Sequence, residues 1–399
     1  MSAAATTGPE AVTDPGDKVE RHVDLRLLVP ALAAWAVDVI LQWSGSAAWV
    51  VVGLAGVAAC GSVWCLRRTR RPDRGRGGAG ARRHTGSAVL ALTCAAVALT
   101  TTCLAGHDAI RSAGSLLSWA GDRASVVVEA VADSDPRRVQ PKADQRGETE
   151  QVVVRARLVL VTARGVTSRL DAPVLVIGGA EWAGLAWQEA FSARGRLAPA
   201  DVGDDVVAIL RATGPPEVTS EAPLVARGAA YVRGRFREAT AQLPTDAAGL
   251  VPALVIGDTS ATPSDLSAAM TATGMSHLSA VSGSNVAIVL AAALGASRLA
   301  GVRRRWRPAV AVVVLAGFVV LARPEPSVVR AAVMGVVGLA GLSASRRRAG
   351  VPALAASIVV LLCWDPWLAR AYGFALSVLA TLGLLVLARP WGERLARLL

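Results

Sequence analysis

The stretch that decides the fold is Arg303–Arg348, RRRWRPAVAVVVLAGFVVLARPEPSVVRAAVMGVVGLAGLSASRRR. It holds two apolar runs, 308–322 and 328–342, between two arginine clusters. A helix that crosses a bilayer needs about 20 apolar residues, because it must satisfy its own backbone where water is absent. The pattern is therefore typical of a helical hairpin in a membrane, bounded on one side by positive charge.

The same pattern recurs along the chain. The predicted spans are 27–43, 47–66, 87–105, 279–294, 308–322, 328–342, 351–364 and 371–388. Several have only 14–18 residues, so we expect some to be tilted, broken or buried in protein. Arginine clusters follow the second, fourth, sixth and eighth spans. By the positive-inside rule, eight spans place every cluster in the cytoplasm. We predict a multi-pass α-helical protein of the cytoplasmic membrane, with both termini cytoplasmic.

The composition supports a membrane protein and excludes several other classes. Hydrophobic residues make up 53% of the 399 residues, and the mean hydropathy is +0.45. The net charge of +12 comes from arginine, since Lys18 and Lys142 are the only lysines. Residues 107–246 contain 17 basic and 18 acidic residues. The excess positive charge of the chain therefore lies at the predicted cytoplasmic face. We therefore prefer topology to nucleic-acid binding as the explanation of the basic loops.

The sequence contains no pattern for metal or nucleotide chemistry. Its five cysteines lie in apolar runs, where a thiol behaves as a small hydrophobe. The motifs HxH, HExxH, CxxC and GxxxxGK[ST] do not occur. We expect no metal, no cofactor and no enzymatic activity in this chain.

A β-rich region begins near residue 124. The predicted strands are 125–129, 151–161, 172–177, 195–197 and 206–211, with a turn at 162–165 and a small helix near 182–190. This pattern favours a small extracytoplasmic β-barrel, and an OB-like fold suits it best. Such barrels bind single strands by stacking bases on aromatic rings beside arginines, which makes Arg155, Arg157, Trp182 and Trp187 DNA-binding candidates. In the alternative, the tryptophans are core residues or membrane anchors, and the arginines lie on a solvated strand face.

Two segments connect this region to the later spans. Residues 224–243 place Val225, Ala229, Val232 and Phe236 at helical spacing, which predicts an amphipathic helix on the membrane surface or packed on the barrel. Next, Thr262-Pro263-Ser264-Asp265 predicts a helix start with Thr262 as the N-cap. A stretch rich in small and polar residues then enters the fourth span, where polar groups usually face a cavity or a pathway.

Several motifs resemble one family. GLVPALVIGDTS at 249–260 and TGMSHLSAVSGSNVAIV at 273–289 are similar to the signature of the ComEC competence family, which internalises DNA during bacterial transformation. PSVVRAA at 326–332 resembles the family's PSxxRA element, and DP at 365–366 with GFALSVLA at 373–380 resembles its DP…GFxLSxLA element. The resemblance covers about 27–399 in the family's order. Asn285 stands where the family more often has histidine.

The resemblance implies a channel for single-stranded DNA. Arg330 is then the best candidate to contact DNA phosphates, with snorkelling to the outer interface as its alternative. Asp258, Thr259, His277, Ser282, Gly283 and Asn285 are candidates for the outer mouth, although a purely structural role is the simpler interpretation of His277. Asp38, inside the first span, should be paired or face a cavity and should not lie in lipid.

The resemblance also implies partners. These are single-stranded DNA, membrane lipid, a competence DNA receptor, a cytoplasmic helicase or ATPase, and a separate nuclease. The family's metallo-β-lactamase-like domain and its HxHxDH motif do not occur within 1–399, so we expect a fragment, a split protein or a reduced, inactive relative. Alternatives to the channel are a transporter for another substrate, which predicts inverted repeats, and a membrane-anchored binding protein.

These predictions divide the chain into five parts. They are a cytoplasmic tail (1–26), three transmembrane helices (27–106), an extracytoplasmic OB-like domain (107–223), an amphipathic helix with the outer-mouth segment (224–278), and a competence-type transmembrane domain of about five spans (279–399).

Overall fold

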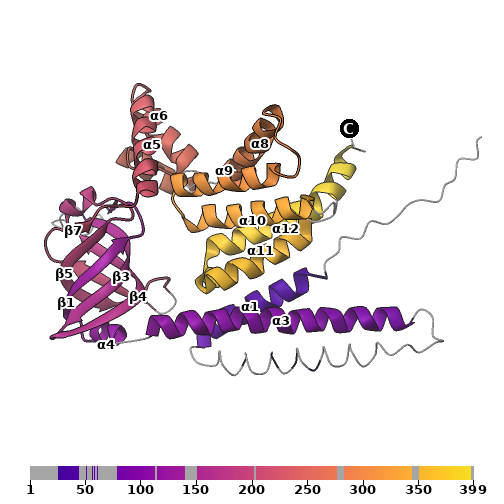
Figure 1. Cartoon of the computed structure of the whole chain (residues 1–399), viewed down its shortest axis with the longest axis horizontal. Coiled ribbons are helices and arrows are strands. Elements are labelled where there is room, and N and C mark those ends of the chain that lie inside the picture. The colour runs from indigo at the N-terminus through magenta and orange to yellow at the C-terminus, as the bar shows by residue number, and fades with distance from the viewer. Residues whose placement is uncertain are drawn as a thin grey trace, which may run out of the picture.

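The computed structural model describes residues 26–44, 79–112, 115–139, 151–201, 204–275, 283–343 and 350–396, with single positions at 51, 56, 58 and 61. These residues form a β-barrel that lies beside one end of a layered set of helices (Figure 1). Most of the predicted second span, 47–66, lies outside the described residues, as do His277 and Ser282.

Five strands close into the barrel. They are β1 (Ser125–Ala132), β3 (Gln151–Ala163), β4 (Val166–Gly178), β5 (Ala190–Pro199) and β6 (Ala208–Ala212). They pair in the order β1-β3-β4-β6-β5, and β5 pairs back with β1. The β4–β6 pair is parallel, and the other pairs are antiparallel. Two short strands extend the edges: β2 (Arg137–Val139) pairs with β3, and β7 (Glu217–Ser220) pairs with β5.

The alternation of side chains explains the barrel. Along β1 every second residue is buried, beginning with Val126 and Val128, because successive side chains point to opposite faces of a strand. The predicted turn is confirmed: Arg164 and Gly165 both have positive φ, +51° and +79°, as a two-residue hairpin turn requires. The helix expected near 182–190 is wrong in extent. A 3-10 helix, η1, covers Ala180–Gly184, and residue 190 already begins β5.

The helices before and after the barrel belong to the same part of the structure. They are α1 (Leu28–Ser44), α3 (Ala79–Ser112), α4 (Leu116–Gly121), α5 (Leu224–Thr240), α6 (Thr245–Ile256), α7 (Ser264–Ala272), α8 (Gly283–Leu299), α9 (Arg307–Ala322), α10 (Pro326–Ser343), α11 (Gly350–Trp364), η3 (Pro366–Arg370) and α12 (Tyr372–Ala396). Among the described residues, one helical segment, Ala88–Arg111 in α3, is long and apolar enough to cross a membrane. Shorter apolar helices cover the other described parts of the predicted spans.

Apolar packing and a few polar contacts hold α1, α3, α11 and α12 together. Ile358 and Phe374 are fully buried in a core that α1, α11, η3 and α12 share. The Trp35 indole on α1 donates a hydrogen bond to the Ala369 carbonyl at 2.8 Å. Asp38 is fully buried and accepts a hydrogen bond from Thr100 on α3, so it faces protein, as the cost of a charge in lipid requires.

The helices have a barrel-facing end, made of the end of α9 and the starts of α8, α10 and α12. Arg323, just after α9, binds Asp135 of the barrel, and α10 begins three residues later. A Cβ on Gly283 at the start of α8 would lie 3.9 Å from Ala331 of α10. The loop before α9 and the end of α12 lie at the opposite end, which places Arg303–Arg307 and Arg394 away from the barrel (Figure 1).

Candidate functional site

Arg330 is buried at the barrel-facing end. The residue is only 8% exposed, and its Nε has no hydrogen-bond partner. Its guanidinium lies against Gly373 at the start of α12, where a Cβ would be 3.3 Å from Nη2. Among the described residues, no carboxylate forms an ion pair with Arg330. The side chain therefore lies between α10 and α12 and does not extend outward.

The predicted outer-mouth residues that the structure describes lie on α8 and on the segment after α6. Asn285, in the first turn of α8, donates a hydrogen bond from Nδ2 to the Leu254 carbonyl at 2.6 Å. Leu254 is in the last turn of α6, where carbonyls lack partners within the helix, so Asn285 supplies one. Thr259 is half-buried, and its carbonyl accepts a hydrogen bond from the Thr262 N–H. Asn285 thus ties α8 to the segment that carries Thr259.

A glycine turn aims Asp258 into the protein. Gly257 has φ +70°, a left-handed conformation, and ends α6 in a Schellman arrangement: its N–H donates to Ala253, and the Asp258 N–H donates to Pro252. Asp258 is consequently 3% exposed, and its Oδ1 accepts hydrogen bonds from the Ser260 N–H and hydroxyl. The expected Thr262 N-cap is wrong, because the Thr262 hydroxyl donates to the Gly249 carbonyl instead.

Asp258 belongs to a group of charges that we call the junction cluster: Asp135, Arg233, Arg237, Asp258 and Arg323. Arg233 Nη2 lies 3.2 Å from Asp135 Oδ2 and 3.5 Å from Asp258 Oδ2. Its Nη1 donates to the carbonyls at positions 256 and 321. Burial lowers the pKa of Arg233, and the carboxylates of Asp258 and Asp135 oppose that shift. The cluster keeps a deeply buried guanidinium paired.

Arg323 completes the junction cluster. Its Nε and Nη2 lie 3.0 and 3.1 Å from the two carboxylate oxygens of Asp135, a bidentate contact. Its guanidinium also covers the Trp187 ring, 4.5 Å from the ring centre. Arg323 has φ +70°, which is strained for a non-glycine residue, so these contacts hold the connection between α9 and α10 in place.

The sequence reasoning missed Asp135, Arg233 and Arg323, and it did not predict that Arg233 lies on the buried face of α5. Val225 is 67% exposed and Val232 is 49% exposed, whereas Arg233 is 5% exposed. The helix packs on α6 and α9 through Ala226, Ala229 and Arg233. An arginine one turn after an alanine on the same face was the available signal, but such a residue usually lies in solvent.

The barrel candidates separate into core and surface. Trp182 is fully buried, stacks edge-on against Phe191 and donates to the Gly214 carbonyl, so it is a core residue and offers no face to a base. Trp187 is buried beneath Arg323. Arg155 and Arg157 lie exposed on β3, and each pairs with a carboxylate, Asp205 and Asp171 respectively.

A second basic surface was not predicted. Arg194 and Arg196 on β5 and Arg211 on β6 are exposed, and Arg196 lies directly opposite Arg211 in the strand register. We call these three residues the β5–β6 arginine patch. None of them forms an ion pair with another described residue. The alternation Arg194-Gly195-Arg196 within a strand was the sequence signal for two arginines on one face.

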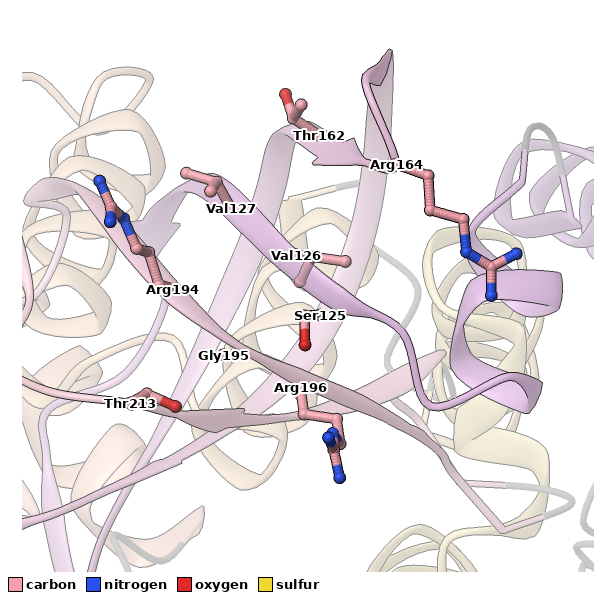
Figure 2. Close-up of a pocket in the computed structure, with 9 residues that line it drawn as sticks. All are labelled: Ser125, Val126, Val127, Thr162, Arg164, Arg194, Gly195, Arg196 and Thr213. Atoms are coloured by element: carbon pink, nitrogen blue, oxygen red, sulfur yellow. The ribbon is translucent and has the colours of Figure 1, made fainter.

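A surface hollow of about 570 Å³ adjoins this patch. It is lined by Ser125, Val126, Val127, Thr162, Arg164, Arg194, Gly195, Arg196 and Thr213. Figure 2 shows that the side chains of Arg164, Arg194 and Arg196, at its rim, point away from one another. Arg164 is occupied by Asp122 at 3.1 Å. This geometry does not surround one small anion, but it suits an extended polyanion. No group of three or more His, Cys, Asp or Glu residues in the described part of the chain could hold a metal ion.

Comparison with known proteins identifies one part of the chain. Residues 254–399 match the model of the family described as competence protein. The match begins in the last turn of α6 and includes Asp258, Asn285, Arg330 and Gly373. It confirms the resemblance for this region and leaves the barrel untested. No curated protein and no solved structure matches the chain.

Proposed function

We propose that this chain, whose residues 254–399 belong to the competence protein family, passes single-stranded DNA across the cytoplasmic membrane during natural transformation. The family match supports a role in competence and DNA uptake. The observation that carries the channel proposal is that the barrel meets the helices at the end where Arg330 is buried. Cations there would offset the cost of moving phosphates into a low-dielectric path.

The strand order supports an OB-like barrel. OB-folds are five-stranded Greek-key barrels that bind oligonucleotides on their second and third strands and on the loops between strands one and two and strands four and five. Here the second and third barrel strands are β3 and β4, and β3 carries Arg155 and Arg157. The parallel β4–β6 pair closes the barrel between its third and fifth strands.

The loop between β1 and β3 and the loop between β5 and β6 both contact the helices. In the loop after β1, Asp135 pairs with Arg233 and Arg323. In the loop between β5 and β6, the Asp205 carbonyl accepts a hydrogen bond from Arg111 at the end of α3. A DNA strand held on β3 would therefore lie next to the barrel-facing end of the helices. We infer that the barrel delivers the strand to this end.

The helix directions support the eight-span topology. The helices α8, α10 and α12 start at the barrel-facing end, and α9 ends there. Arg303–Arg307 and Arg394 lie at the opposite end (Figure 1). With that end in the cytoplasm, as the positive-inside rule requires, the barrel is extracytoplasmic and α12 ends in the cytoplasm. Membrane lipid surrounds the apolar helices in this arrangement.

Import also needs partners. The sequence has no Walker-type phosphate loop, so we propose that a cytoplasmic helicase or ATPase supplies the energy. We further propose a DNA receptor that delivers DNA to the barrel and a separate nuclease that removes the second strand.

Deletion and complementation in the native host test this function. Labelled DNA is followed in three fractions: bound at the surface, protected from added nuclease, and recombined into transformants. We expect the deletion to keep surface-bound DNA and to lose protected DNA and transformants, and residues 1–399 with their native partners to restore both. Wild-type transformation in the deletion strain would overturn the proposal. Loss of surface-bound DNA together with the two later fractions would indicate a membrane-anchored binding protein.

A further inference from the structure

Arg330 and the start of α12 bring two positive groups together. Nη2 of Arg330 lies 3.3 Å from the position of a Cβ on Gly373, in the first turn of the 25-residue helix α12. The first N–H groups of a helix have no partners within it and carry partial positive charge. In the described part of the chain, no group accepts a hydrogen bond from the Tyr372 or Gly373 N–H.

Burial makes this arrangement costly. Buried charges are normally paired or hydrogen-bonded. Arg233 and Arg323 are buried to the same extent as Arg330, and they share the carboxylate of Asp135. Arg330 has no such partner among the described residues, and its Nε makes no hydrogen bond. One anion that contacts both the guanidinium and the first N–H groups of α12 would satisfy both groups.

We propose that Arg330 and the Tyr372 and Gly373 amides form an anion site that takes one phosphodiester group of a DNA strand. The identity of this ligand rests on the proposed function. A guanidinium presents a planar fork that matches phosphate oxygens, and a helix N-terminus presents N–H groups to the same kind of anion. The site lies at the barrel-facing end, where a strand leaving β3 would reach the helices first.

Gly373 is the positioning residue of this site. A Cβ there would lie 3.3 Å from Nη2 and 3.9 Å from Nη1 of Arg330. These atoms are the far end of a flexible side chain, so alanine would shift the guanidinium by a few tenths of an ångström and leave the backbone in place. Gly383, in the same helix, has no atom within 4 Å of its Cβ position and provides a matched control.

A double-mutant cycle tests the site. The full chain, in nanodiscs of phosphatidylcholine, is titrated with a fluorescent single-stranded oligothymidine at low salt. We expect Arg330→Gln to weaken binding about tenfold, Gly373→Ala about threefold, and the double variant no more than Arg330→Gln alone. Arg330→Lys should retain part of the affinity, and Gly383→Ala should retain all of it. A methylphosphonate oligonucleotide, which lacks backbone charge, should not discriminate between wild type and Arg330→Gln.

Other outcomes would overturn the site. If the two substitutions act additively, or reduce thermal stability while DNA affinity stays unchanged, Arg330 has a structural role. A second titration uses nanodiscs that contain phosphatidylglycerol. If this lipid stabilises the wild type but not Arg330→Gln or Gly373→Ala, and DNA affinity is equal in all three, the site binds a lipid headgroup.

Transformation in the host separates this proposal from the proposed function. We expect Arg330→Gln, at normal membrane abundance on immunoblots, to reduce transformation about tenfold or more. If deletion of the gene abolishes transformation but both variants transform normally, the anion site is wrong and the channel proposal stands. If the deletion has no effect, the channel proposal fails, and DNA binding in nanodiscs still decides the site.

Discussion

Arginine occupies two contrasting settings in this chain. In the β5–β6 arginine patch, three arginines lie exposed in water without ion pairs to other described residues. At the barrel-facing end, Arg233, Arg323 and Arg330 are each less than a tenth exposed. Exposed charges are screened by salt and contribute little individually. Buried charges are costly unless they are paired, so the partner determines their effect. DNA binding by the barrel should therefore depend on how many exposed arginines it carries. The stability of the barrel-facing end should depend on whether each buried arginine has a partner.

The barrel likewise contains two kinds of residue, apolar side chains in its core and charged side chains on its surface. If the barrel is stabilised by its apolar core and not by its surface charges, a core substitution should have the largest effect. We expect Trp182→Ala to destabilise the barrel by about 3–5 kcal/mol, because the ring is fully buried against Phe191. Protease sensitivity of the full chain in increasing urea measures this. Trp306→Ala, at an exposed tryptophan, is the control. Unchanged stability with lost DNA binding would show that a base reaches Trp182.

A substitution in the junction cluster tests how much pairing contributes to the stability of the buried arginines. Asp135→Asn removes the carboxylate that Arg233 and Arg323 share. We expect a loss of about 2–4 kcal/mol, because two buried guanidinium groups lose a charged partner. The thermal unfolding midpoint in one detergent measures the effect. Asp171→Asn, at the exposed pair with Arg157, should cost about 0–1 kcal/mol. Equal shifts for both variants would show that burial does not distinguish the two settings.

Local patterns allowed much of the fold to be predicted from sequence. Strand alternation indicated the barrel, and Arg164-Gly165 indicated its hairpin turn. Apolar runs located the helices that precede and follow the barrel. The motifs after residue 249 identified the competence region, which the family match at 254–399 confirms. Each of these signals lies within a short stretch of chain.

The missed features depend on contacts between distant segments. Asp135, Arg233 and Arg323 come from three separate elements, and each resembles an ordinary solvated charge in its own neighbourhood. The burial of Arg233 on α5 was missed for the same reason, since this arginine pairs with carboxylates that no local period reveals. From its sequence neighbourhood alone, Trp182 fitted either a core position or a stacking platform. The closed barrel buries it completely, which makes it a core residue.

Substitutions in the exposed β5–β6 arginine patch should have the smallest effect, a loss of DNA affinity that depends on the salt concentration. We expect Arg194→Gln, Arg196→Gln and Arg211→Gln together to weaken binding of a single-stranded oligonucleotide about tenfold at low ionic strength. Each phosphate contact to a single strand contributes about 0.7 to the slope of log K against log salt, so three lost contacts should reduce it by about 2. Arg155→Gln with Arg157→Gln should change the slope less, because these arginines already face carboxylates. Anisotropy titrations of the full chain at several salt concentrations measure both slopes. If the triple substitution leaves the slope unchanged, the DNA lies only on the face formed by β3 and β4, and the β5–β6 arginine patch has no binding role.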